Sequence, residues 1–156
     1  MTNVAAWELV HSVETVVSPE CAWTFMSNVA NWDDPPATFS LRGPFVAGST
    51  GTTLVPGQEP RHWIIRAVTP GNSYTVEMTL DQAVLSFAWR FEGLASGGGT
   101  RITQRVSLSG ANAGAYVNQV RPVFESTLAP GMNRIVALMQ QHPGALMQQH
   151  HVASGN

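Results

Sequence analysis

The chain has 156 residues, enough for one domain with a hydrophobic core and too few for two domains of ordinary size. Charged residues make up 12% of it, and all eight cations are arginines because the sequence contains no lysine. The absence of lysine excludes Schiff-base, P-loop and kinase chemistry that needs a primary amine. The formal net charge of −2 disfavours partners such as nucleic acid or anionic membranes.

Cysteine content and hydropathy narrow the class of protein further. Cys21 is the single cysteine, so intramolecular disulfides and paired-cysteine metal or redox sites are excluded. Residues 1–10 lack the basic and apolar regions of a signal peptide, and no stretch approaches the roughly 18 to 20 apolar residues of a membrane span. We therefore expect a cytoplasmic protein without stable membrane insertion, with no cofactor and no metal. The sequence leaves the oligomeric state open.

The first predicted elements are a strand and a short helix. Apolar residues alternate over 9–17, which is typical of a half-buried strand. Ser18-Pro19-Glu20 then provides an N-cap, a proline at the first helical position and an acid at the positive helix end. A helix should therefore begin at Pro19 and end before Pro35-Pro36, because proline cannot continue the hydrogen-bond ladder.

Short extended runs separated by glycine and proline turns follow, and they predict an antiparallel meander. Alternation in the later runs puts aromatic and aliphatic side chains on one face and charges such as Arg90 and Arg105 on the other. The predicted strands are 38–42, 49–54, 61–68, 74–80, 84–92 and 100–109.

The last third of the chain changes to helical periodicity. Apolar residues recur every three or four positions over 113–142, which predicts one long amphipathic helix with a kink or break near Pro130. Residues 145–150 repeat the Ala-Leu-Met-Gln-Gln-His sequence of residues 137–142, and we expect a mobile tail over 143–156. We therefore expect one domain over residues 1–142. The histidines of the tail have no carboxylate or thiolate at metal-ligand spacing, so they predict no metal site.

The order of these elements and several motifs resemble the polyketide cyclase/dehydrase-like branch of the START and birch-pollen-allergen superfamily, often called SRPBCC. The motifs are Val-Glu-Thr-Val-Val-Ser-Pro-Glu-Cys-Ala-Trp-Thr-Phe-Met at 13–26, Gly-Ser-Thr-Gly at 48–51, the Trp89 strand with Gly-Gly-Thr-Arg at 98–101, and Val-Ser-Leu-Ser-Gly at 106–110. The resemblance implies an α+β helix-grip fold, in which a curved antiparallel sheet of about seven strands wraps around the C-terminal helix. It also implies a cavity between them for a hydrophobic ligand.

Within that fold, alternation predicts which residues face the cavity. We expect ligand binding by the inward-facing residues of the sheet and helix, which are Thr15, Trp63, Tyr74, Met78, Phe87, Trp89, Gln104, Val117, Phe124 and Leu128. For most of the apolar ones, plain core packing is the more common explanation. Gln104 is the best indication of a site, because an amide between Ile102 and Val106 is costly to bury without a partner.

Three functions remain open at this point. The favoured hypothesis is binding of a lipid-like or polyketide-like small molecule. The first alternative is a cyclase or dehydratase that uses His11 as acid or base and Arg66 as the anion-stabilising group. The second is a co-chaperone-like interaction module whose core is filled by side chains. Fold alone does not choose among them.

Overall fold

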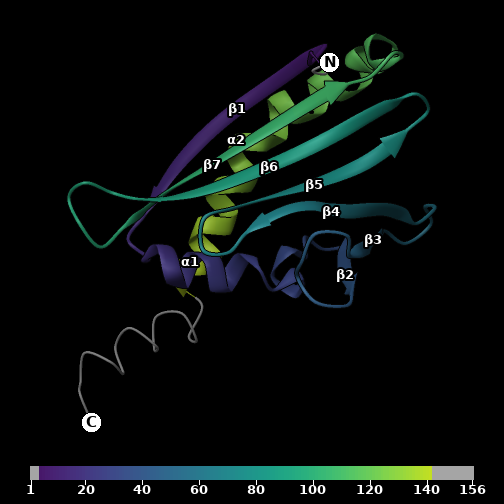
Figure 1. Cartoon of the computed structure of the whole chain (residues 1–156). Helices are drawn as coiled ribbons and strands as arrows, with labels where there is room; N and C mark the ends of the chain where they lie inside the picture. The colour runs from purple at the N-terminus through teal and green to yellow at the C-terminus, as the bar shows by residue number, and fades with distance from the viewer. Residues whose placement is uncertain (1–3, 142–156) are drawn as a thin grey trace.

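The computed structural model describes residues 4–141, and these form a curved seven-stranded sheet with a long helix on one face (Figure 1). The predicted tail and its histidines lie outside the described residues. The strands are β1 (Trp7–Thr15), β2 (Thr38–Arg42), β3 (Thr50–Leu54), β4 (Arg61–Thr69), β5 (Ser73–Leu80), β6 (Ala83–Gly93) and β7 (Thr100–Ser109). The helices are α1 (Pro19–Met26), η1 (Val29–Trp32), η2 (Ala113–Tyr116) and α2 (Val117–Gln141).

All neighbouring strands pair antiparallel in the order β1-β7-β6-β5-β4-β3-β2. Strands β2 to β7 therefore form a meander in sequence order, and β1 pairs with β7 as the edge strand of the sheet. The register places His11 opposite Gln104 and Tyr74 opposite Trp89, so these pairs share the inner face. A bulge in β4 lies between Ile65 and Ala67. The predicted helix-grip α+β fold is confirmed.

Local signals explain where the helices begin and end. The Ser18 hydroxyl accepts a hydrogen bond from the Cys21 backbone N–H at 3.2 Å, as expected for an N-cap. The predicted first helix is divided, however, because α1 ends at Met26 and a separate 3₁₀ turn, η1, follows. The Trp32 indole N–H donates to the Met26 carbonyl at 2.7 Å, which folds η1 back onto the end of α1.

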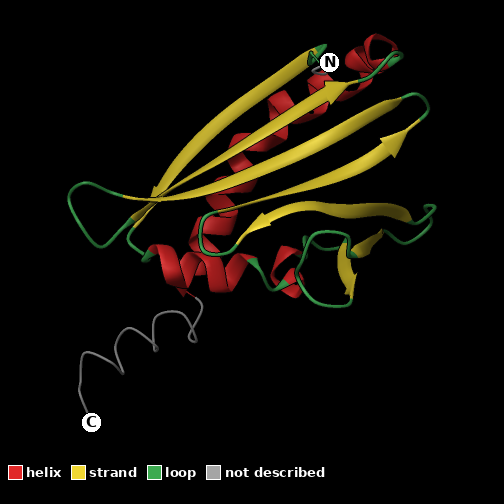
Figure 2. Ribbon diagram, viewed as in Figure 1, coloured by secondary structure: helices red, strands yellow, loops and turns green. Residues whose placement is uncertain are grey.

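The long helix α2 runs behind the sheet in Figure 2 and is continuous from Val117 to Gln141. The break considered near Pro130 does not occur. Proline removes one hydrogen bond from the helix, but Leu128, Met132 and Met139 are buried on both sides of Pro130. Their packing in the core keeps the chain helical through Pro130.

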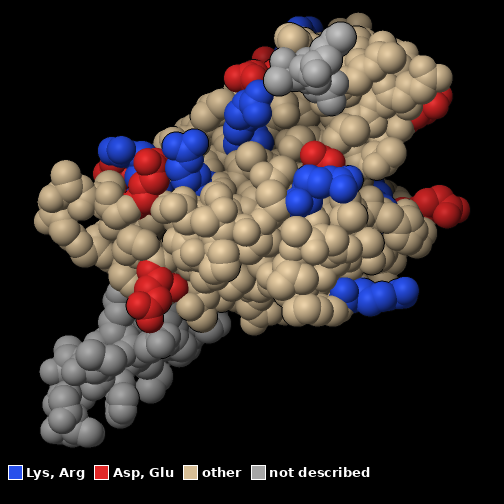
Figure 3. Space-filling model, viewed as in Figure 1, with Lys and Arg blue, Asp and Glu red and all other residues tan. Residues whose placement is uncertain are grey.

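The outer face of the sheet carries paired charges, as the alternation predicted. Arg105 bonds Glu8 at 2.6 Å, Arg101 bonds Glu14 at 2.9 Å and Arg66 bonds Glu77 at 3.0 Å, each across neighbouring strands. The hydrogen bond from Arg105, together with its charge, lowers the pKa of the Glu8 carboxyl. Figure 3 shows blue and red side chains side by side on this face. Within residues 4–141, no helix is long and apolar enough to cross a bilayer.

Candidate ligand cavity

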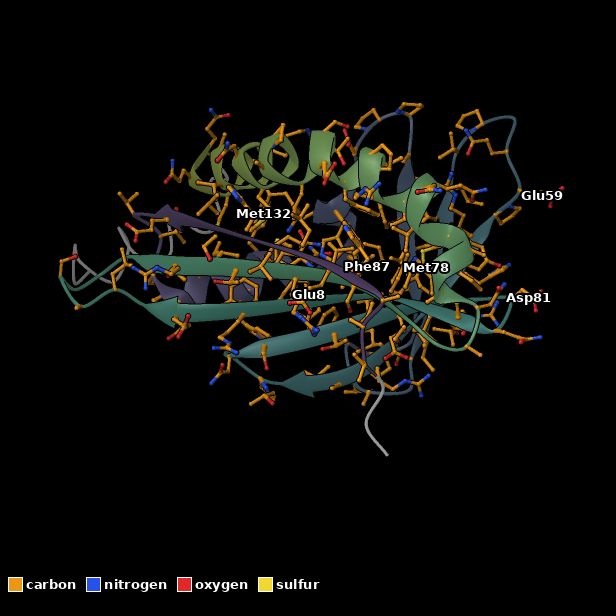
Figure 4. The ribbon with its side chains drawn as sticks, turned by 90° about the horizontal axis from the view of Figure 1, so that it is seen from above. Glu8, Glu59, Met78, Asp81, Phe87 and Met132 are labelled. Atoms are coloured by element: carbon orange, nitrogen blue, oxygen red, sulfur yellow. The ribbon has the colours of Figure 1, made fainter. Side chains whose placement is uncertain are left out.

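A cavity of about 310 Å³ lies between the inner face of the sheet and α2. Its walls come from α1, η1, six strands and α2, so it depends on the whole fold. Figure 4 shows Met78 of β5 and Phe87 of β6 in the space between the sheet and the helix. Of the predicted ligand-binding residues, the cavity is lined by Trp63, Tyr74, Met78, Phe87, Trp89, Gln104 and Phe124.

Trp63 can form one wall of the cavity because the residue beneath its ring, Gly51, has no side chain. Gly51 pairs with Trp63 across β3 and β4, and a Cβ atom at Gly51 would lie 2.2 Å from the indole ring. Only a residue without a side chain therefore permits this ring position. The Trp63 indole N–H donates to the Thr53 hydroxyl at 3.0 Å, which fixes the orientation of the ring.

Aromatic rings surround Tyr74. The rings of Trp32 and Trp89 lie nearly parallel to it, at centroid distances of 5.8 Å and 6.0 Å. Phe45 meets it edge-on at 5.1 Å, and Phe91 lies at 6.1 Å. These contacts leave Tyr74 only 1% exposed and fix its ring in one position.

The hydroxyl of Tyr74 has no hydrogen-bond partner within residues 4–141, and it is the single buried side-chain polar atom there of which this is true. Burial raises the pKa of this hydroxyl well above its usual value of 10.0, so it stays protonated and can donate at neutral pH. A buried hydroxyl without a partner costs free energy that a bound oxygen atom would recover. Tyr74 is one of the residues that line the cavity, so the cavity wall contains one residue with an unsatisfied buried polar atom among the described residues.

Two further polar residues belong to the same inner face. Gln104 is 8% exposed and lines the cavity, so the amide singled out by the sequence lies where it was expected. His11 is half-buried opposite Gln104 on β1, but it is not part of the cavity wall.

Five predicted site residues do not line the cavity. The Arg66 side chain is on the outer face, 56% exposed and paired with Glu77, because it alternates with Trp63 and Ile65 along β4. His11 and Arg66 therefore do not share a site. The Thr15 hydroxyl donates to the Gln140 side chain at 2.8 Å and ties β1 to the end of α2. Neither Val117 nor Leu128 lines the cavity.

The residues predicted to bind the ligand make up about half of the cavity wall. The additional lining residues are Met26, Trp32, Phe39, Thr53, Arg61, Val76 and Ile135. Alternation with Trp63 is a signal that would have assigned Arg61 to the inner face. No local signal assigns Met26 and Trp32, because their place depends on how α1 and η1 pack beneath the sheet.

A second hollow, about 830 Å³ in volume, lies on the outer face of β2 to β5. Its side chains are mostly polar and include Arg42, Thr52 and His62. Arg66 and Glu77 in its wall are paired with each other. No buried polar atom in this wall lacks a partner, so the inner cavity is the better candidate site. Among residues 4–141, no group of three or more His, Cys, Asp or Glu could hold a metal ion.

Comparison with known proteins identifies the family of the chain. Residues 6–140 match the family model described as polyketide cyclase / dehydrase and lipid transport. The chain belongs to this family. The superfamily resemblance seen in the sequence is thereby confirmed, and a ligand-binding or cyclase-like role follows for this member of the polyketide cyclase/dehydrase family. A search of curated proteins found no match.

Solved structures share the fold at low sequence identity. Truncated norcoclaurine synthase from Thalictrum flavum is 14% identical with a TM-score of 0.67, and the match covers 91% of this chain and 97% of that one. A protein from Nitrosomonas europaea is 15% identical with a TM-score of 0.68, over 90% and 99% of the two chains. Ara h 8.0201 is 14% identical with a TM-score of 0.64, over 87% and 99%. At these identities the likeness shows the fold alone.

Proposed function

We propose that the chain binds a small aromatic molecule that carries an oxygen atom, in the cavity between the sheet and α2. The observation that carries this proposal is the unpartnered hydroxyl of Tyr74 in a wall otherwise rich in aromatic rings. The rings provide apolar and stacking contacts for the ligand, and the hydroxyl provides one directional contact. Such a combination favours a flat ligand with a polar substituent over a purely aliphatic one.

The cavity volume limits the size of the ligand. Small-molecule pockets span roughly 300–1,000 Å³, and this cavity of about 310 Å³ is at the lower end. It suits a molecule of one or two rings better than a long-chain lipid. An open space of this volume also favours a ligand-binding role over the interaction module, in which side chains would fill the core.

Binding is favoured over cyclase chemistry by the residues of the wall. Cyclisation of a polyketide-type substrate needs a base near a carbonyl group. The described lining residues include no His, Asp or Glu, and the two residues expected to act together, His11 and Arg66, lie on opposite faces of the sheet. A structural neighbour, norcoclaurine synthase, has been solved in complex with dopamine and hydroxybenzaldehyde, and this supports aromatic molecules as the class to test first.

The proposal is tested by filling the cavity. Ile135 of α2 lines it, whereas Leu138, one turn further along, is 37% exposed and does not. We expect 2-naphthol to bind the wild-type protein in isothermal titration calorimetry. Ile135→Trp should weaken that binding at least about tenfold, because the larger ring occupies the ligand's space. Leu138→Trp should leave it unchanged. Absence of binding to the wild type, or equal binding by both variants, would overturn the proposal.

A further inference from the structure

The cavity has one charged residue in its wall, and that residue is exposed. Arg61 begins β4 on the same face as Trp63, and it is the one exposed residue among the described lining residues. It therefore marks the place where the cavity opens to solvent.

The charge of Arg61 is not neutralised by the protein. Its Nη2 donates to the Gln58 side chain at 3.0 Å, but that amide is uncharged. None of the four ion pairs within residues 4–141 involves Arg61. Glu59 is the nearest acid in the sequence, and Figure 4 shows it projecting from the loop between β3 and β4 into solvent. At least three of the five guanidinium N–H donors remain for another partner.

The rest of the wall contains no acid among the described residues, so Arg61 gives the cavity a positive charge at its mouth. An exposed guanidinium attracts an anion that binds beside it, and added salt screens this attraction. The planar fork of arginine also matches the two oxygens of a carboxylate. Arg66, by contrast, already has Glu77 as its partner on the outer face.

We infer that the ligand is an aromatic carboxylic acid whose carboxylate is bound by Arg61 while its ring lies among the aromatic side chains. This inference rests on the proposed function and specifies the class of molecule that the cavity selects. The selectivity comes from charge at the mouth and from ring contacts inside, so an uncharged ester of the same ring system should bind less tightly than the acid.

The test compares 2-naphthoate with methyl 2-naphthoate, which has the same ring system without the charge. Isothermal titration calorimetry would use the wild type, Arg61→Gln, Arg61→Lys and the outer-face control Arg66→Gln. We expect the wild type to bind the acid about tenfold more tightly than the ester. Arg61→Gln should lose this preference, because its affinity for the acid should fall much more than its affinity for the ester. Arg61→Lys should retain part of the preference, and Arg66→Gln should retain all of it.

Added salt supplies a second readout. Because Arg61 is exposed, affinity for the acid should fall with ionic strength in the wild type and stay nearly constant in Arg61→Gln. Equal affinity of the wild type for acid and ester would overturn the inference and leave the proposed function standing. So would an equal loss of preference in Arg61→Gln and Arg66→Gln. Absence of binding by acid, ester and 2-naphthol alike would overturn both.

Discussion

The two faces of the sheet are built from alternating residues of the same strands, and they differ in how their polar groups are satisfied. On the outer face, Arg66 of β4 and Glu77 of β5 form an ion pair, and both side chains remain in contact with water. On the inner face of β5, Tyr74 is buried among rings and its hydroxyl has no partner. The difference shows that polarity alone does not mark a site. A polar group indicates ligand binding when it is buried, fixed in position and left unsatisfied.

The largest expected difference between the faces is in stability. Phe91 is 3% exposed and packs against Trp23 and Tyr74, whereas its neighbour Arg90 is exposed on the other face. Phe91→Ala should lower the free energy of unfolding by about 3–5 kcal/mol, because it opens a void in the core. Arg90→Ala should change it by less than about 0.5 kcal/mol. Urea unfolding of both variants measures this, and similar losses would refute the assignment of faces.

A second comparison uses glycines. A Cβ atom at Gly51 would overlap the ring of Trp63, while nothing lies within 4 Å of one at Gly131 in α2. Gly51→Ala should destabilise the protein by about 1–3 kcal/mol and alter the cavity wall, because the indole must move. Gly131→Ala should stabilise it by about 0.5–1 kcal/mol through helix propensity. Thermal unfolding measures both effects, and a neutral Gly51→Ala would mean that Trp63 does not lie over β3.

A third comparison concerns the two tyrosine hydroxyls. Tyr74→Phe removes a buried hydroxyl without a partner, so the ligand-free protein should gain about 1 kcal/mol. Tyr116→Phe is the matched control, since its hydroxyl accepts a hydrogen bond from the Asp81 backbone N–H. A loss of stability in Tyr74→Phe would show that the hydroxyl has a stabilising partner within the protein.

The same hydroxyl predicts a pH dependence. Burial raises the pKa of the Tyr74 hydroxyl in the folded state, so below the ordinary tyrosine pKa of 10.0 the group is protonated in the folded and unfolded chains alike and its titration does not change stability. Above about pH 10 the unfolded chain releases the proton while the folded chain keeps it, so stability falls with rising pH. The chain has no lysine to titrate in this range. Urea unfolding between about pH 8 and pH 11 should show a decline in the wild type that is smaller in Tyr74→Phe.

The sequence predicted features that depend on neighbouring residues, and it did not predict contacts between residues far apart in the chain. Alternation along β5 and β6 was sufficient to assign Tyr74, Met78, Phe87 and Trp89 to one face, because that pattern is local. Strict alternation also places Arg66 and Trp63 on opposite faces of β4, and the cyclase hypothesis did not take this into account. The partner of Thr15 is Gln140, 125 residues away, and no local pattern connects the two.

Long-range packing also determined the part of the wall that was missed. Trp32 reaches the cavity because η1 folds back under the sheet and its indole bonds the Met26 carbonyl. The unsatisfied state of the Tyr74 hydroxyl is a property of all its surroundings together. A sequence can show that a tyrosine faces inward, but whether its hydroxyl finds a partner is decided only by the folded arrangement.

The measurement that tests the account most directly is a calorimetric titration of 2-naphthol into the wild type, Tyr74→Phe and Tyr116→Phe. The chain has two tyrosines, and only the first of this pair lines the cavity. The account predicts that Tyr74→Phe binds about tenfold more weakly although it is the more stable protein, because the ligand loses its hydrogen bond. Tyr116→Phe should bind like the wild type. Equal affinities of Tyr74→Phe and the wild type would contradict the account.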